Sequence, residues 1–282
     1  MGSRRKRRVL STPFSLPHSS SVRIALGLEY DGTDFVGWQS QRDSRSVQET
    51  LAVAIAAVAD HPVLVSGSGR TDAGVHAAQQ IAHFDTEAQR EPRQWLLGIN
   101  SNLPADIAVQ WVTSVEPDFD ARRSALRRRY CYRIQQRSVR SALSRRRTWW
   151  LRDSLDCAAM TAAASSWLGE NDFSAFRAAG CQSSTPMRRL MAVGIRQRES
   201  MLELEFTANA FLQHMVRNLV GVLVEIGKGK EAPSWAAEVL AGRDRTLGGV
   251  AAPPQGLTLM EVGYPERFGL PTAATASVHR TL

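Results

Sequence analysis

The sequence lacks the features by which several classes of protein are recognised. Only three of its 282 residues are lysine and only three are cysteine, and no apolar run reaches the roughly 18 to 20 residues that a membrane span requires. Cys131, Cys157 and Cys181 lie far apart without a C-x-x-C pair, which predicts reduced thiols in a cytoplasmic protein. The basic N-terminus is followed by no clear apolar segment of an export signal. We therefore expect a globular cytoplasmic protein that does not bind membranes.

Positive charge is concentrated in two places. Residues 4–8 carry five positive charges, and residues 122–147 contain eleven arginines and no acid. Setting these sixteen charges against the formal total of +8 leaves −8 for the rest of the chain. Positive charge concentrated in this way on an otherwise acidic protein is typical of proteins that bind a polyanion. Nucleic acid is the leading candidate.

The glycine-rich stretch Ser66–Ala77, SGSGRTDAGVHA, follows the apolar residues 63–65, which predict a short strand. Its glycines allow the tight turns of a shaped loop that carries Arg70 and Asp72. The residues alone also allow a surface turn with a solvated ion pair. No Gly-Lys-Ser/Thr closes the run, which disfavours a phosphate loop. Asp72 and His76 could share a helical face, but no third ligand stands at a recognisable spacing, so no metal site is predicted.

Residues 127–134, RRRYCYRI, alternate in a way that predicts a strand. Tyr130, Tyr132 and Ile134 share one face and arginines line the other. Arginines mixed with aromatic rings suit RNA, because guanidinium groups hold phosphates and a flat ring supports an unstacked base. The same pattern also fits a half-buried strand with core tyrosines and a solvated face.

The rest of the chain alternates between strands and helices. Further strands are expected at residues 22–30, 81–84, 109–115, 191–196, 201–206 and 257–264. Helices are expected at residues 46–59, 92–100, 154–168, 211–226 and 234–240, and a loop or short turn at 169–177. We divide the chain into a basic disordered tail, an N-terminal half, a C-terminal half and a C-terminal tail: 1–21, 22–150, 151–268 and 269–282. This pattern predicts an α+β fold with mainly antiparallel sheet.

Arg217 is the only charged residue between Thr207 and Val224. In the helix predicted at 211–226 an apolar stripe is formed by Phe211, Met215, Leu219 and Val222, and a separate line by His214, Arg217 and Gly221. Arg217 must therefore leave an otherwise buried helix in one direction. From the helix alone, it could equally be a snorkelling arginine that reaches solvent along its own stem.

The string GRTDAGVHA resembles the signature of the TruA family of tRNA pseudouridine synthases. Five further blocks are similar to that family in the same order: LEYDGTDFVGWQ, RRYCYRI, GENDFSAFR, FLQHMVRNLVG and GLTL. Together they cover residues 22–268. The resemblance implies the pseudouridine synthase fold, in which two helix-flanked halves form a continuous, mainly antiparallel sheet with a basic central cleft. It also implies a homodimer.

The resemblance assigns roles to individual residues. It implies that Asp72 is the catalytic carboxylate, with the basic Arg217 beside it, and that Arg70 fills the gap left by a displaced base or holds the RNA backbone. Tyr130 matches the active-site tyrosine. Leu257 is expected to form a wall of the pocket. We further expect Arg128 and Arg129, next to Tyr130, to contact the RNA.

The implied activity is isomerisation of uridine in the anticodon stem-loop of tRNA, around positions thirty-eight to forty. Uracil moves from an N1 to a C5 linkage on ribose without gain or loss of atoms, so no cofactor is expected. The carboxylate could attack C1′, stabilise an oxocarbenium-like centre or remove a ribose proton to give a glycal. Two alternatives remain: a noncatalytic RNA-binding or RNA-folding protein on the same scaffold, and a metal-dependent nuclease that uses Asp72 and His76.

Overall fold

Ten strands form one continuous sheet within residues 21–271, the part of the chain that the computed structural model describes. Eight of them follow the order β4-β1-β3-β10-β5-β9-β8-β7, while β2 pairs with β3 and β6 with β5. The strands are β1 (Val22–Tyr30), β2 (Ser66–Gly67), β3 (His76–Thr86), β4 (Ile107–Val115), β5 (Arg127–Gln136), β6 (Trp149–Leu151), β7 (Gly169–Asp172), β8 (Met187–Arg198), β9 (Met201–Ala208) and β10 (Leu257–Gly263).

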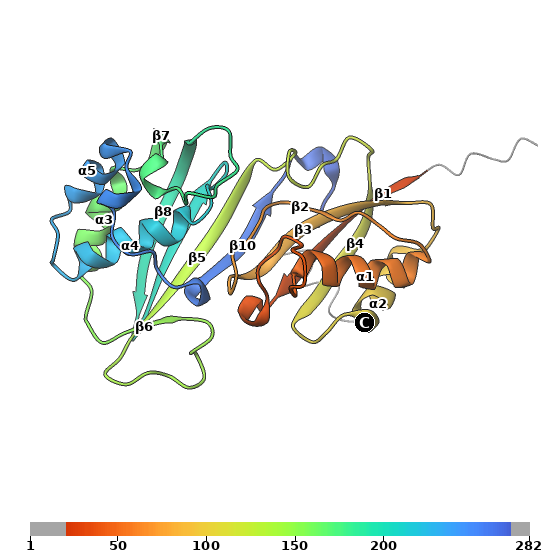
Figure 1. Cartoon of the computed structure of the whole chain (residues 1–282), viewed down its shortest axis with the longest axis horizontal. Helices are drawn as coiled ribbons and strands as arrows, with labels where there is room; N and C mark the ends of the chain where they lie inside the picture. The colour runs from red at the N-terminus through yellow and green to blue at the C-terminus, as the bar shows by residue number, and fades with distance from the viewer. Residues whose placement is uncertain (1–20, 272–282) are drawn as a thin grey trace, which may run out of the picture.

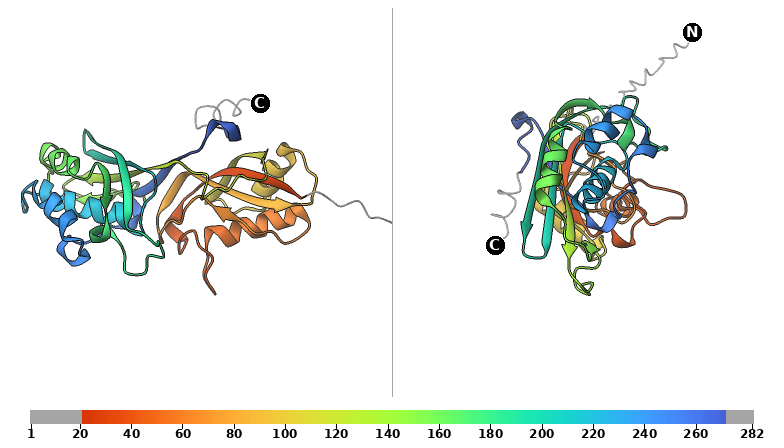
Figure 2. Two further views of the ribbon diagram at one scale, coloured as in Figure 1. Left: turned by 90° about the horizontal axis from the view of Figure 1, so that it is seen from above. Right: turned by 90° about the vertical axis from the view of Figure 1, so that its left-hand side faces the viewer.

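Five α-helices accompany the sheet in the described residues: α1 (Val47–Ala59), α2 (Pro92–Asn102), α3 (Cys157–Ser165), α4 (Met215–Gly227) and α5 (Trp235–Gly242). The molecule is elongated, with α1 and α2 at one end and α3, α4 and α5 at the other (Figures 1 and 2). All strand pairs are antiparallel except β10 with β3 and β5 with β6. The prediction of an α+β fold with mainly antiparallel sheet is confirmed.

Strand β10 joins the two halves of the sheet. It comes from late in the chain but runs between β3 and β5, near the middle of the molecule (Figure 1). Thr258 pairs with His76 of β3 and with Cys131 of β5. Leu257 and the start of β3 are thereby brought together, although about 180 residues separate them in the sequence. Only a long-range strand pairing of this kind can place the GLTL block beside the GRTDAGVHA loop.

Helix α1 shows why the helices begin where they do. Ser46 precedes it with extended backbone, and its hydroxyl accepts the Glu49 N–H at 3.3 Å, which satisfies a donor that the first turn leaves free. Leu51 and Ile55 lie fully buried against the sheet. Asp60 ends the helix in the left-handed conformation. The predicted start and end of this helix are confirmed.

The strand predicted at residues 63–65 is wrong. These residues have no strand pairing, and the only strand here is the two-residue β2 that follows. Leu64 is 91% exposed, while Val65 is buried and its carbonyl accepts the Gln48 side-chain amide. A strand forms only where a neighbouring strand is available for pairing, and residues 63–65 have none. Of the three apolar residues, Val65 alone is buried, and the segment is irregular.

Two predictions in the C-terminal half also require correction. The third helix begins at Cys157 rather than near Ser154, since the Asp156 carboxylate accepts two N–H groups of the first turn. Residues 169–177, predicted as a loop or short turn, contain a 3₁₀ turn but begin with the strand β7, which forms because it pairs with β8. Strand β6 was not predicted, and β3, β4 and β8 are longer than predicted. Pairing with neighbouring strands extends each of these three strands beyond the apolar residues from which it was predicted.

The helix predicted at 211–226 begins four residues later. Phe211–His214 precede α4, and His214 adopts the left-handed conformation immediately before the first helical residue. The prediction that His214 and Arg217 lie on one line of the same helix is therefore wrong, because His214 is not part of the helix. Both side chains nevertheless lie near the same residue, Asp72.

The predicted N-terminal tail, residues 1–21, lies outside the described residues except for its last position, and the predicted C-terminal tail except for its first three. Among residues 21–271, none of the helices has the length and apolarity needed to cross a membrane.

Candidate active site

The loop between β2 and β3 carries Arg70 and Asp72, and its neighbours hold it in one shape. The Thr71 hydroxyl shares a buried 2.8 Å hydrogen bond with the Tyr30 hydroxyl, and the Thr71 carbonyl accepts the Trp38 N–H at 3.1 Å. Asp72 itself forms an isolated bridge with Gly37. The aromatic segment after β1 thus provides the support on which the Asp72 loop lies.

Gly37 makes this close approach possible. Its φ is +108°, a conformation that side-chain-bearing residues rarely adopt. A Cβ there would lie 2.5 Å from the Thr71 carbonyl oxygen. Any larger residue would therefore push the Asp72 loop away.

Asp72 lies between two basic side chains. Arg217 Nη1 is 3.2 Å from Asp72 Oδ2, and His214 Nε2 is 3.5 Å from the same oxygen. The side chains of Asp72 and Arg217 are only 19% and 15% exposed. Arg217 therefore does not run along its stem to solvent but points at the carboxylate.

The main chain that follows α5 fixes Arg217. Its Nε donates to the Ala252 carbonyl at 2.8 Å, and the Ala252 N–H donates to the Arg217 carbonyl at 3.0 Å. Gly221, one turn further along α4, lets this segment approach, because a Cβ there would collide with the Val250 carbonyl oxygen. A guanidinium bound at Nε has little freedom, so its terminal nitrogens stay aimed at Asp72.

A cavity of about 550 Å³ opens above Asp72, between the two halves. Its walls include Arg70, Asp72, Tyr130, Gln182, His214 and Leu257. Tyr130 is 8% exposed and meets Phe211 edge to face, with ring centroids 5.1 Å apart. Burial raises the pKa of Tyr130 to about 12, with the Arg128 charge opposing and the Asp72 charge adding to the rise. The phenol is therefore protonated at neutral pH.

Two arginines connect the halves across this cavity. Arg70 Nη1 donates to the Gln182 side chain at 2.8 Å. Arg128 donates to three carbonyls, at 2.7 Å to Ser68, 2.9 Å to Arg122 and 2.9 Å to Asn209. Burial lowers the pKa of Arg128. Its donors are largely occupied by the protein itself, so its contribution is to hold the cleft together.

Among the predicted site residues, Arg129 neither lines the cavity nor contacts Asp72, whereas Arg217 does not line it but reaches it through Asp72. Arg129 lies on the opposite face of β5, within 3.6 Å of Glu205 and 3.2 Å of Glu261. Carboxylates from elsewhere in the chain pair with six of the eleven arginines between residues 122 and 147: Arg123, Arg127, Arg129, Arg133, Arg146 and Arg147. The cluster therefore offers less free charge than the sequence suggests.

His76 is occupied elsewhere. Its Nδ1 accepts the Gly32 N–H at 3.1 Å, its Nε2 lies 2.8 Å from the Arg146 carbonyl, and its side chain is 1% exposed. Within residues 21–271 no grouping of three or more metal-ligating side chains is found. The residues of this region contain no donor set for the metal that the nuclease alternative requires.

Comparisons with known proteins identify relatives of this chain. A family model described as tRNA pseudouridine synthase matches residues 28–122 and 163–265. The chain is 51% identical to tRNA pseudouridine synthase A of Methylococcus capsulatus, over 88% of this chain and 92% of that protein. It is 50% identical to the Coxiella burnetii enzyme of that name over 89% and 96%, and 49% identical to the Xanthomonas euvesicatoria enzyme over 90% and 100%.

The chain belongs to the tRNA pseudouridine synthase family. Members of this family are isomerases that convert uridine to pseudouridine. Asp72, Arg217 and Leu257 lie inside the matched segments, whereas Tyr130 falls between them. A chain of a Cbf5-Nop10-Gar1 complex aligns with 84% of this chain and 57% of its own length at 8% identity, with a TM-score of 0.34. That likeness carries no weight in the assignment.

Sequence reasoning about this pseudouridine synthase did not identify two residues of the cavity. Gln182 carries no recognisable motif, and only the fold places it opposite Arg70. His214 stood three residues before Arg217, which was a usable signal, but the expected helix concealed its backbone conformation.

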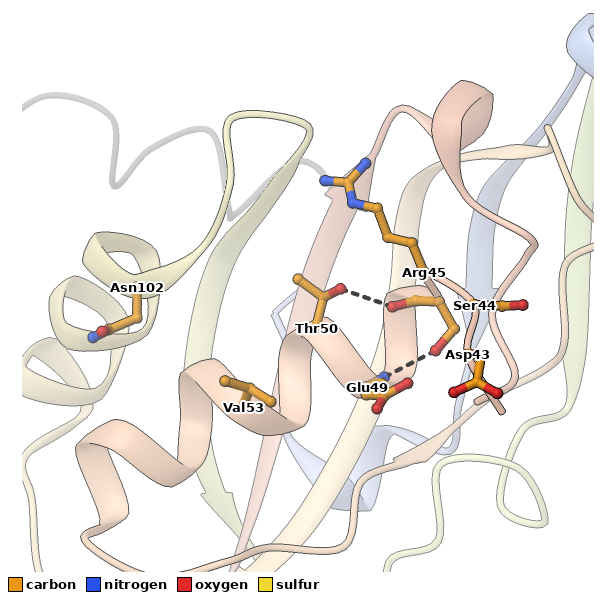
Figure 3. A pocket seen from close by; sticks show the side chains of 8 residues that line it. Asp43, Ser44, Arg45, Glu49, Thr50, Val53 and Asn102 are labelled. Atoms are coloured by element: carbon orange, nitrogen blue, oxygen red, sulfur yellow. Dashed lines mark hydrogen bonds between the residues drawn. The ribbon is translucent and has the colours of Figure 1, made fainter. Parts of the chain in front are cut away.

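A second hollow, of about 460 Å³, lies at the start of α1 (Figure 3). Its polar groups are used in local structure: the Ser46 hydroxyl accepts the Glu49 N–H, and the Thr50 hydroxyl donates to the Ser46 carbonyl. Arg45 pairs with Asp106 at 2.8 Å. These contacts stabilise the beginning of the helix.

Proposed function

We propose that this pseudouridine synthase modifies the anticodon stem-loop of tRNA, around positions thirty-eight to forty, with Asp72 as its catalytic carboxylate. The observation that carries the proposal is the Asp72 carboxylate at the base of the cavity, held by Arg217 at 3.2 Å. A carboxylate fixed by a guanidinium in a concave, partly dry site is ready to act on an electrophilic carbon.

The reaction accounts for the other residues. A uridine must leave its stack to reach Asp72. The bond from N1 to C1′ breaks and a bond from C5 to C1′ forms, after which C5 loses a proton and N1 holds one. Asp72 takes part by attack on C1′, by stabilising an oxocarbenium-like centre or by removing a ribose proton. Tyr130 supports the displaced base as a protonated phenol, and Leu257 forms the adjacent wall.

Arg70 is proposed to leave Gln182 and enter the stem when RNA binds. Its side chain is exposed, and the hydrogen bond that it donates within the described chain goes to a neutral amide, so an RNA phosphate or a vacated stack can replace Gln182. Arg128 shapes the cleft through its three carbonyl contacts. Arg129 falls outside the proposed site.

We further propose that the enzyme acts as a homodimer in the cytoplasm. The family resemblance motivates this proposal. Light scattering of the purified full chain at micromolar concentration measures the mass directly: twice 31.1 kDa is expected, and a single chain would contradict it.

The decisive experiment uses unmodified tRNA transcripts and position-resolved mapping of pseudouridine. Product is expected in the anticodon stem-loop, with or without EDTA. Asp72→Asn keeps the shape of the side chain but supplies neither nucleophile nor base, so turnover should fall by at least about a thousandfold. Its tRNA affinity should stay within about threefold, because binding rests on the arginines.

Each alternative has its own outcome. Binding without product by the unmodified protein would support a noncatalytic RNA-binding or RNA-folding protein. Cleavage that EDTA abolishes would support a nuclease. Substantial turnover by Asp72→Asn would remove Asp72 from the reaction while leaving the family assignment in place.

A further inference from the structure

The two oxygens of Asp72 have different surroundings. Both basic contacts, from Arg217 at 3.2 Å and from His214 at 3.5 Å, are made to Oδ2. Within residues 21–271 no hydrogen bond is made to Oδ1. Rotation of the carboxylate about its last bond would break the Arg217 hydrogen bond and carry Oδ2 away from the His214 imidazole. Oδ1 is therefore the oxygen left for the substrate.

The backbone of His214 is held in an unusual state. Its φ of 63° and ψ of 0° lie in the left-handed region, where only five non-glycine residues of the described chain are found. Glycine suits this conformation best, and histidine is among the side-chain-bearing residues found there more often than most. A reason for the turn is to be sought in what the side chain contacts.

Helix capping does not supply that reason. His214 occupies the position before α4, but its side chain makes no capping hydrogen bond. The helix uses the main chain instead, with the His214 carbonyl accepting the Asn218 N–H at 2.9 Å. The imidazole is 35% exposed, lines the cavity and lies 3.5 Å from the Asp72 carboxylate. Its position relates to the site rather than to the helix.

We propose that His214 is a positioning residue that, together with Arg217, fixes Asp72 through Oδ2 so that Oδ1 is the reacting oxygen. This inference rests on the proposed catalytic role of Asp72. From its left-handed turn, His214 brings its imidazole to within 3.5 Å of the Asp72 oxygen that Arg217 also contacts. The contact is long in the free enzyme, and such contacts commonly tighten when substrate binds.

His214→Gly separates this role from a structural one. Glycine fits the left-handed backbone, so the melting temperature should be at least that of the unaltered enzyme and at most about 2 °C higher. The kcat for pseudouridine formation should fall about 10- to 100-fold, because the carboxylate can then pivot. The KM for tRNA should change less than about twofold, since RNA contacts are intact. Added imidazole should restore part of kcat by entering the vacated space.

His214→Asn provides a second variant, because asparagine also tolerates the left-handed region. It should be as well folded as the unaltered enzyme and lose kcat to a similar degree. Asp60→Gly is the matched control: Asp60 has a φ of 62°, is exposed and ends α1, away from the cavity. It should gain stability in the same way with no change in kcat.

The outcomes separate the inference from the function on which it rests. An unchanged kcat in both His214 variants, while Asp72→Asn is inactive, would overturn the role of His214 alone. A loss of kcat that follows a loss of stability, without rescue by imidazole, would also overturn it. Full turnover by Asp72→Asn would instead overturn the catalytic role of Asp72.

Discussion

Two adjacent arginines on β5 have opposite surroundings. Arg128 faces the cavity and donates to carbonyls on both sides of the cleft, whereas Arg129 faces away and meets Glu205 and Glu261. A one-residue step along a strand reverses the direction of the side chain. The guanidinium of Arg128 thus holds main-chain carbonyls in place, whereas that of Arg129 is neutralised by carboxylates. A count of arginines in a segment therefore overestimates the charge that reaches RNA.

The unpaired arginines complete this comparison. In the described chain, four arginines of the cluster are exposed without a carboxylate within salt-bridge distance: Arg122, Arg137, Arg140 and Arg145. Three of them belong to the segment between β5 and β6, and Arg122 lines the cavity. We expect these four to supply most of the attraction of the cluster for tRNA. Substitution of these unpaired arginines should therefore weaken tRNA binding more than substitution of the paired arginines.

Among the arginine substitutions, the largest effect is expected for Arg217→Met. Methionine fills the buried position but leaves Asp72 without its guanidinium, so turnover should fall about 100-fold or more, with some loss of stability. Combined with Asp72→Asn, the double variant should be little worse than Asp72→Asn alone. The double-mutant cycle compares pseudouridine formation by the unaltered enzyme, the two single variants and the double variant. Additive losses would show that the two residues act independently.

Arg128→Met should act through stability. Three carbonyl acceptors are deprived of a charged donor, so the free energy of unfolding should fall by about 2–3 kcal/mol, measured by urea denaturation. Arg129→Met is the control on the other face and should cost less than about 1 kcal/mol, because it removes partly exposed ion pairs. Equal losses would contradict the distinction between the faces.

Replacing Arg137, Arg140 and Arg145 by glutamine should weaken tRNA binding about tenfold with little change in kcat. The slope of log affinity against log salt should fall by about one for each phosphate that the protein no longer neutralises. The corresponding change of the paired residues Arg127, Arg129 and Arg133 should leave this slope nearly unchanged. If the paired set had the larger effect on the slope, RNA would bind the opposite face of β5.

The smallest effect concerns Glu261. Burial would raise the pKa of this carboxyl, but hydrogen bonds from Arg127 and Arg129 outweigh it and hold the pKa below its usual 4.5. A lowered folded-state pKa stabilises the fold above about pH 4.5, and the contribution disappears as pH falls through the folded value. Glu261→Gln should therefore lower the free energy of unfolding by about 0.5–1 kcal/mol at pH 7, and the difference should vanish in acid. A difference that grew in acid would contradict this assignment.

Features decided by a few neighbouring residues could be predicted from the sequence. Strand β1 and helix α1 have the predicted bounds, because alternation and the Ser46 cap are local signals. The glycine-rich loop identified Asp72 as the candidate carboxylate. Arg217 stood out as the one charge on an apolar helix. The strand and the helix needed only side-chain chemistry and their periods. The roles expected for Asp72 and Arg217 came from the family resemblance, because the residues alone also allowed a surface turn and a snorkelling arginine.

Contacts between distant segments were decided by the tertiary structure. Nothing near Arg129 in the chain indicates that Glu205 and Glu261 neutralise it, while Arg128 turns to the cleft. Likewise, Gly221 admits the Val250 segment that fixes Arg217, and His214 adopts a left-handed turn within an apparent helix. Strand pairing and close packing join residues far apart in sequence, so their partners exist only once the sheet has formed. The sequence by itself thus determined the candidate groups for chemistry, and the fold decided which of them meet.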